Sequence, residues 1–126
     1  DVEPAMARLR ALRDRLEQEI AARLAGSVVI GRDLPRLPNT TLFQFAGVDT
    51  EAVLARLDLA GFCCSSGSAC AAGAHQVSHV LTALGRVGRG AVVRVSTSRL
   101  SQSSDTESLV AALVDGVNQL RQTTHG

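Results

Sequence analysis

The 126-residue sequence contains no lysine, no tryptophan and no tyrosine, and these absences limit both its chemistry and its core. All thirteen basic residues are arginines, whose guanidinium group keeps its proton in proteins and therefore cannot act as an amine nucleophile. Any reaction that needs a Schiff-base lysine must take that lysine from elsewhere. Because only three residues are aromatic, all of them phenylalanines, the core must consist mainly of aliphatic side chains.

The sequence also lacks a long apolar run and a strong charge of either sign. No stretch approaches the roughly 20 apolar residues of a membrane-spanning helix, and no charged-then-apolar leader opens the chain. The net charge of +1 gives no reason to expect a nucleic acid or an anionic membrane as a partner. We therefore expect a cytoplasmic protein. Since the first residue is Asp1 and not methionine, we also expect a piece of a longer protein.

Cysteine is scarce, and Cys63, Cys64 and Cys70 all fall within eight residues. Adjacent cysteines rarely form a disulfide with each other, and an odd number is a poor basis for a disulfide framework. Reduced thiols in a cytoplasmic protein fit this pattern better. Cys63 and Cys64 continue an apolar run after Phe62, so we interpret them as small hydrophobic residues that fill the core.

Hydrophobic periodicity predicts a single α/β (α+β) domain over residues 1–126, with a short sheet covered by helices. Apolar residues recur every three or four positions over residues 6–24, which predicts an amphipathic helix that ends before Gly26. The expected strands are residues 28–30, 40–46, 62–64 and 91–97. The expected later helices are 50–57 with Asp49 as N-cap, one after the loop 65–73 that stops at Gly85, and one opened by a Ser104–Glu107 capping box.

Residues 65–73 are a stretch of small residues, too rich in serine and glycine to pack as a regular element. Cys70 lies near the end of this stretch, just before a predicted helix whose first amide groups would stabilise a thiolate. Its small neighbours would let the thiol move between two partners. From local composition alone, a reactive nucleophile and a half-buried structural cysteine are equally good interpretations of Cys70.

Arg94 stands in the middle of a predicted strand that otherwise consists of valines. Because side chains alternate along a strand, Val93 and Val95 belong to one face, and Arg94 and Ser96 belong to the other. An unpaired guanidinium in an apolar setting is costly, and its planar fork suits a carboxylate bound at two points. The pattern equally allows an arginine that simply faces water.

A metal site is a further alternative, because His75 and His79 lie four residues apart on a predicted helix, near Cys64 and Cys70. The sequence has no Cys-x-x-Cys pair, and the spacing between Cys64 and Cys70 matches no common zinc motif. We therefore expect no metal in this chain, with the two histidines at the surface or packed against the loop.

The string Ser65-Ser66-Gly67-Ser68-Ala69-Cys70 resembles the active-site loop of the NifS/IscS-type cysteine desulfurases, the group with the longer, mobile cysteine loop. Further blocks agree in the same order, from about residue 37 to residue 120. They are Leu37-Pro38-Asn39 with Gly47-Val48-Asp49-Thr50-Glu51, Ser78-His79-Val80-Leu81 with Ala83-Leu84-Gly85, and Val93-Arg94-Val95-Ser96 with Arg99. The sequence departs from the family pattern at Ser98, where glycine is usual, and at residues 101–105, which lack the usual threonine and glutamate.

The resemblance implies the small C-terminal domain of a fold-type I enzyme that depends on pyridoxal phosphate. By matching position, Cys70 would be the catalytic residue that takes sulfur from L-cysteine as a persulfide and leaves L-alanine. Arg94 would bind the substrate carboxylate. The active-site loop, Ser65, Ser66, Gly67, Ser68 and Ala69, would carry the sulfur to an acceptor such as an iron–sulfur scaffold protein, where Cys70 could contact a nascent cluster.

The family's large domain supplies the cofactor lysine and most of the homodimer contact, and it has no counterpart in these 126 residues. We therefore expect this chain to be inactive by itself. Two alternatives remain: a stand-alone persulfide carrier or adaptor without its own catalysis, and a small zinc- or thiol-binding structural domain. Iron–sulfur cluster assembly, transfer-RNA thiolation and DNA sulfur modification are all compatible destinations of the sulfur.

Overall fold

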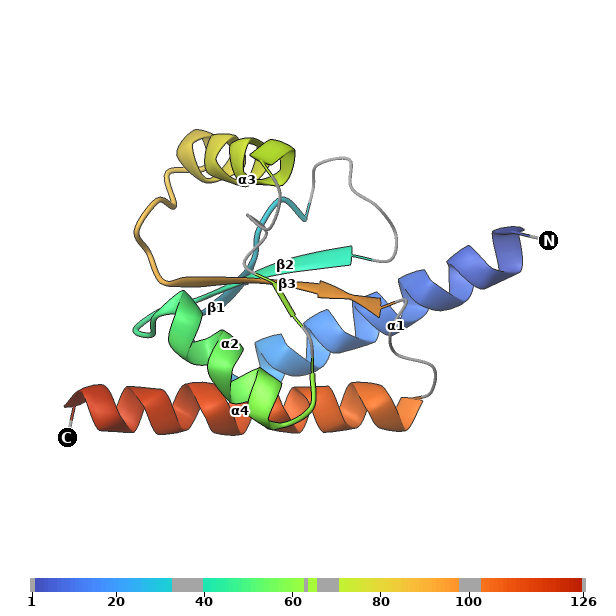
Figure 1. The fold of residues 1–126 in the computed structure, drawn as a ribbon. Coiled ribbons are helices and arrows are strands. Elements are labelled where there is room, and N and C mark those ends of the chain that lie inside the picture. Colours follow the sequence, from blue (N-terminus) through green and yellow to red (C-terminus); the bar gives the residue numbers. More distant parts are fainter. Residues whose placement is uncertain (1, 33–39, 63, 66–70, 98–102, 126) are drawn as a thin grey trace.

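The computed structural model describes residues 2–32, 40–62, 64, 65, 71–97 and 103–125 (Figure 1). These residues form four helices and three strands, which confirms the predicted mixture of helices around a short sheet. In chain order the elements are α1 (Val2–Arg23), β1 (Ser27–Val29), β2 (Thr40–Phe45), α2 (Thr50–Leu59), α3 (Ala71–Ala83), β3 (Ala91–Ser96) and α4 (Ser103–His125).

The sheet is antiparallel, and β2 is its central strand, between β1 and β3. Phe43 lies opposite Val93 in the register of β2 and β3, and both side chains are fully buried. Leu42 lies opposite Arg94, whose side chain is exposed. The predicted alternation along β3 is therefore confirmed. We call the face that bears Leu42, Gln44, Val92 and Arg94 the outer face of the sheet.

The helices divide unequally between the two faces of the sheet. Figure 1 shows α1, α2 and α4 together on one side and α3 alone on the other. The core lies on the three-helix side and is aliphatic apart from Phe43 and Phe45, whose rings stack with centroids 5.6 Å apart. Its other members include Leu16, Ile20, Leu24, Val53, Leu57, Val93, Val95, Leu109, Leu113 and Val117. The prediction that the core consists mainly of aliphatic side chains is thus confirmed.

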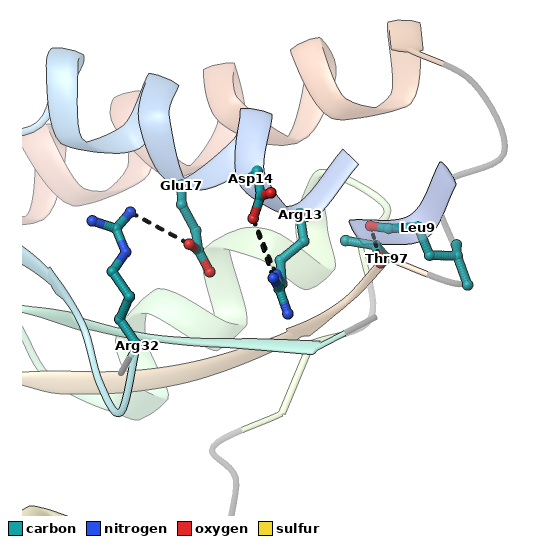
Figure 2. A network of polar contacts seen from close by, with 6 residues as sticks. All are labelled: Leu9, Arg13, Asp14, Glu17, Arg32 and Thr97. Atoms are coloured by element: carbon teal, nitrogen blue, oxygen red, sulfur yellow. Dashed lines mark hydrogen bonds and ion pairs between the residues drawn. The ribbon is translucent and has the colours of Figure 1, made fainter. Parts of the chain in front are cut away.

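Polar contacts join α1 to both edges of the sheet (Figure 2). Nη2 of Arg32, which follows β1, lies 3.4 Å from Oε1 of Glu17. The hydroxyl of Thr97, which follows β3, donates a hydrogen bond to the carbonyl oxygen of Leu9 at 3.3 Å. Because Glu17 is only 2% exposed, its carboxylate needs a paired cation, and Arg32 supplies one from the neighbouring segment.

The predicted N-cap of α2 and the predicted glycine stops of three helices are confirmed. The carboxylate of Asp49 accepts a hydrogen bond from the amide of Ala52 at the start of α2. Gly26, Gly61 and Gly85 follow the ends of α1, α2 and α3 with φ of +77°, +92° and +68°. Glycine adopts this left-handed conformation without the steric cost that a Cβ atom brings.

Three sequence predictions are wrong in detail. Residues 62 and 64 are not in a strand, because the amide of Phe62 is bound to the carbonyl oxygen of Leu57 at 2.9 Å. Helix α3 begins at Ala71, so residues 71–73 are helical and not part of the loop; alanine is the best helix former, which explains the longer helix. Helix α4 begins at Ser103, before the predicted N-cap, and Oε1 of Glu107 accepts a hydrogen bond from Arg15 on α1.

No helix among the described residues is both long enough and apolar enough to cross a bilayer.

Gly90 is the position at which we expect the fold to tolerate a side chain least. A Cβ atom there would lie 2.1 Å from the carbonyl oxygen of Phe45, and φ is +134°. Gly90→Ala should therefore lower the free energy of unfolding by about 3 kcal/mol, as measured by urea unfolding followed by circular dichroism. In the control Gly88→Ala, φ is +72° but no atom lies within 4 Å, so only the left-handed conformation should cost about 1 kcal/mol. Equal losses in the two variants would contradict the close contact with Phe45.

Candidate functional site

The backbone of Arg94 is bound to the first residue of the predicted active-site loop. The amide of Arg94 donates to the carbonyl oxygen of Ser65 at 2.6 Å, and the amide of Ser65 donates back to the carbonyl oxygen of Arg94 at 3.3 Å. The two residues form an isolated antiparallel bridge on the edge of β3. The predicted active-site loop and the predicted substrate-binding arginine therefore lie next to each other at Ser65 and Arg94.

The guanidinium group of Arg94 is available to a ligand on the outer face. Its side chain is exposed, and no hydrogen bond or ion pair joins it to a side chain within the described ranges. The strand beneath it is fixed on both sides, by β2 and by Ser65, so the base of the side chain has one position. An arginine on a rigid strand is well suited to a carboxylate that approaches from outside.

The segment that leads from α2 to Ser65 is held against the core. Phe62 and Cys64 are half-buried and pack against the core cluster. The interpretation of Cys64 as a core-filling residue is confirmed, whereas Cys63 lies outside the described residues. A further contact fixes the same strand edge, because the amide of Val92 donates to the hydroxyl of Thr50 at 3.1 Å.

The other predicted loop residues, Ser66, Gly67, Ser68, Ala69 and Cys70, lie outside the described residues. The structure fixes both ends of this segment, since Ser65 is bridged to Arg94 and α3 begins at Ala71. The five peptide steps from Ser65 to Cys70 span at most about 18 Å. This length is an upper limit on the separation of the Cα atoms of Ser65 and Cys70.

A zinc site gains no support from the residues that can be placed. His79 is exposed on α3, and Cys64 packs against the core. The side chain of His75 and the whole of Cys70 lie outside the described residues. No group of three or more histidine, cysteine, aspartate or glutamate side chains comes together in the described part of the chain.

The sequence prediction missed Gln44 and Arg86, which are joined on the outer face. The side-chain amide of Gln44 donates to the carbonyl oxygen of Arg86 at 2.9 Å, and Nε of Arg86 donates to Oε1 of Gln44 at 2.6 Å. Gln44 is 1% exposed. The available signal was a glutamine within the otherwise apolar centre of β2, which needs a polar partner when it is buried.

A cavity of about 340 Å³ lies between α1 and the β1 edge of the sheet. Its lining includes Glu17, Ile20 and Phe43. Because Phe43 belongs to the core face, this cavity opens on the side of the sheet opposite to Arg94. It therefore does not belong to the site formed around Ser65 and Arg94.

Comparison with known proteins shows the family of this chain. Residues 1–109 match the family model described as aminotransferase class-V. The chain belongs to the class-V aminotransferase family. Its curated relatives in this family include the cysteine desulfurase of Cereibacter sphaeroides, 43% identical over 116 residues, and that of a Nostoc species, 36% identical over 122 residues. These alignments cover 90% and 95% of this chain, respectively.

A solved structure extends the family match to the fold. The NifS-like protein from Rickettsia africae superposes with a TM-score of 0.72 at 28% sequence identity, over 90% of this chain. That match covers 29% of the Rickettsia chain, and this chain spans about 30% of the length of the two cysteine desulfurases. The shared fold therefore concerns one part of each of these proteins.

The residues of this chain do not form a pyridoxal phosphate site by themselves. Class-V aminotransferases use this cofactor, which binds through a Schiff base to a lysine. The sequence contains no lysine, and its arginines cannot replace it. The described residues thus place an exposed guanidinium beside Ser65, but they include no group that could anchor the cofactor covalently.

The bridge between Ser65 and Arg94 can be tested by amide hydrogen exchange at Arg94. Ser65→Pro removes the amide that donates to Arg94 and should accelerate exchange of the Arg94 amide at least about tenfold, because the two bonds support each other. Ser65→Ala keeps both backbone bonds and should leave the exchange rate unchanged. Slow exchange of the Arg94 amide in Ser65→Pro would show that the bridge does not hold this edge.

Proposed function

We propose that this chain is the sulfur-accepting part of a cysteine desulfurase, in which Arg94 holds the carboxylate of L-cysteine and Cys70 takes its sulfur. The observation that carries the proposal is the backbone bridge of Ser65 to Arg94, since it attaches the cysteine loop beside an exposed guanidinium. The identity of its relatives as cysteine desulfurases supports the same substrate.

Arg94 recognises the substrate by its acid group. A guanidinium donates two parallel hydrogen bonds to a carboxylate, which fixes the orientation of the amino acid as well as its position. Because Arg94 projects from the outer face, the bound substrate would lie on the side of the sheet where α3 is found.

Cys70 accepts the sulfur atom as a persulfide. Its thiolate forms a sulfur–sulfur bond with L-cysteine while the carbon–sulfur bond of the substrate breaks, and the electron pair and a proton go to that carbon to give L-alanine. The thiol is oxidised, the carbon is reduced, and no external oxidant is needed. The position just before α3 favours a thiolate, because this 13-residue helix has no acidic residue in its first turn to cancel the positive end of its dipole.

The reaction needs pyridoxal phosphate as an electron sink. In this proposal the cofactor is bound by residues outside these 126. We therefore place this chain as the C-terminal small domain of a longer enzyme whose large domain binds the cofactor and forms a homodimer. From Cys70 the persulfide sulfur passes to an acceptor protein, such as an iron–sulfur scaffold. A reducing cytoplasm suits a carrier that must remain a free thiol between transfers.

The decisive experiment is Cys70→Ser in the full-length holoenzyme. It should abolish the persulfide detected by mass spectrometry and the sulfide released from L-cysteine, because serine cannot form a sulfur–sulfur bond. Cys64→Ser is the matched control and should retain transfer, since Cys64 packs against the core. Persistent transfer in Cys70→Ser would mean that another cysteine carries the sulfur. If the wild-type protein forms the persulfide only when a second protein donates the sulfur, it is a stand-alone carrier and not a desulfurase.

Arg94→Gln should raise KM for L-cysteine roughly 10- to 100-fold, since a charge-assisted hydrogen-bonded pair contributes about 1.5–3 kcal/mol. Steady-state kinetics of sulfide release measure this change. Arg89→Gln is a matched control, because Arg89 is another exposed arginine just before the same strand. An unchanged KM in Arg94→Gln, or an equal rise in both variants, would exclude Arg94 as the carboxylate-binding residue.

A further inference from the structure

We propose that Gln44 and Arg86 form a positioning pair that sets the place of α3, and through α3 the place of Cys70, over the face that bears Arg94. The inference rests on the proposed function and adds two residues to it. Neither residue belongs to the cysteine loop or touches the substrate in this scheme. Both act through the element that begins at the residue after Cys70.

The first step is the burial of Gln44 on a face that three helices leave uncovered. Gln44 lies on β2 two positions from Leu42, which pairs with Arg94, so Gln44 and Arg94 share the outer face. A glutamine that is 1% exposed must have its amide satisfied. Arg86 satisfies it twice, as a backbone acceptor at 2.9 Å and as a guanidinium donor at 2.6 Å.

The second step is the coupling of Arg86 to α3. The amide of Gly85 donates to the carbonyl oxygen of Thr82 at 3.1 Å, and the amide of Arg86 donates to that of Leu81 at 2.8 Å. With φ of +68° at Gly85, this is a Schellman motif, which fixes the residue after the helix to the last turn. The hydrogen bonds between Gln44 and Arg86 therefore also hold the C-terminal end of α3 in place.

The third step concerns the few other contacts that hold α3 to the rest of the described structure. Figure 1 shows α3 alone on its side of the sheet, and within the described ranges it makes no extended contact with a strand or another helix. Its apolar residues Val77, Val80 and Leu81 are only half-buried, and Leu84 is 47% exposed. Because none of these described side chains is fully buried, the bond through Arg86 is an important constraint on the position of the helix.

The residue before the cysteine segment and the residue that follows α3 are thus bound to two neighbouring strands. Ser65 is fixed to Arg94 on β3, and α3 is fixed through Arg86 to Gln44 on β2. A shift of α3 would move the attachment of Cys70 relative to a substrate held by Arg94. Since a misplacement of about 1 Å can cost up to about 100-fold in rate, the pair affects the transfer step more than substrate binding.

The test compares Gln44→Leu and Arg86→Met in the full-length holoenzyme with L-cysteine as substrate. Gln44→Leu removes both hydrogen bonds of the pair and should lower kcat for sulfur transfer to Cys70 about tenfold, while KM changes less than about twofold. Arg86→Met removes the guanidinium bond but keeps the backbone acceptor for Gln44, so it should lower kcat in the same direction by a smaller factor. The double variant should lose no more than Gln44→Leu alone, because that change already removes both hydrogen bonds of the pair. If Gln44→Leu does not fold, the half-exposed Arg86→Met still decides the question.

Gln119→Leu is the matched control. Oε1 of Gln119 accepts a hydrogen bond from Arg56, so this pair has the same side-chain types, but it joins α2 to α4 on the other side of the sheet. Gln119→Leu should leave kcat unchanged. Hydrogen exchange gives a second readout that needs no activity: the amides of residues 77–83 should lose protection in Gln44→Leu and keep it in Gln119→Leu.

Equal kcat in Gln44→Leu, Arg86→Met and wild type would overturn the proposal, even if protection of α3 is lost. Equal loss of kcat in Gln119→Leu would also overturn it, since the effect would then be one of general stability. Failure of the proposed function gives a different result. The wild type would form no persulfide on Cys70 and the pair would have no role in sulfur transfer, while hydrogen exchange would still show whether it holds α3.

Discussion

The alternation of side chains along β2 and β3 is the constraint on which the rest of the structure depends. One face of these strands gives Phe43, Phe45, Val93 and Val95 to the core, and three helices cover it. The other face is then left for polar groups that the core could not accommodate. A single register therefore decides both which side chains stabilise the core and on which face Arg94 is exposed.

This division separates stability from chemistry within a small domain. Substitutions on the core face act on the free energy of unfolding, whereas the exposed Arg94 can change with less effect on the packed layers. The helix that follows the cysteine loop lies on the lightly packed side, away from α1, α2 and α4. The NifS-like protein from Rickettsia africae has this fold over 29% of its length, and the chain spans about 30% of the cysteine desulfurase of Cereibacter sphaeroides.

The sequence predicted most of the fold because its signals were local. The valine–arginine alternation placed β3, Asp49 placed the start of α2, and Gly61 and Gly85 placed the ends of two helices. The bridge of Ser65 to Arg94 and the pairing of Gln44 with Arg86 could not be predicted in this way. Both join segments that are distant in the chain, and their existence depends on the register of strands and not on the composition of either segment. Residue types also misled at Ala71 and at Phe62, where helix propensity and a helix-end hydrogen bond outweighed the appearance of a loop and a strand.

The outer edge of β3 has a further consequence for how the protein behaves in a crowded solution. An open strand edge invites pairing with another molecule, and a valine-rich strand is especially prone to it. Here the amide of Val92 is taken by Thr50 and the amide of Arg94 by Ser65, so two of the donors on this edge are not available for intermolecular strand addition. The contacts at Thr50 and Ser65 therefore reduce the tendency of this edge to pair with another molecule.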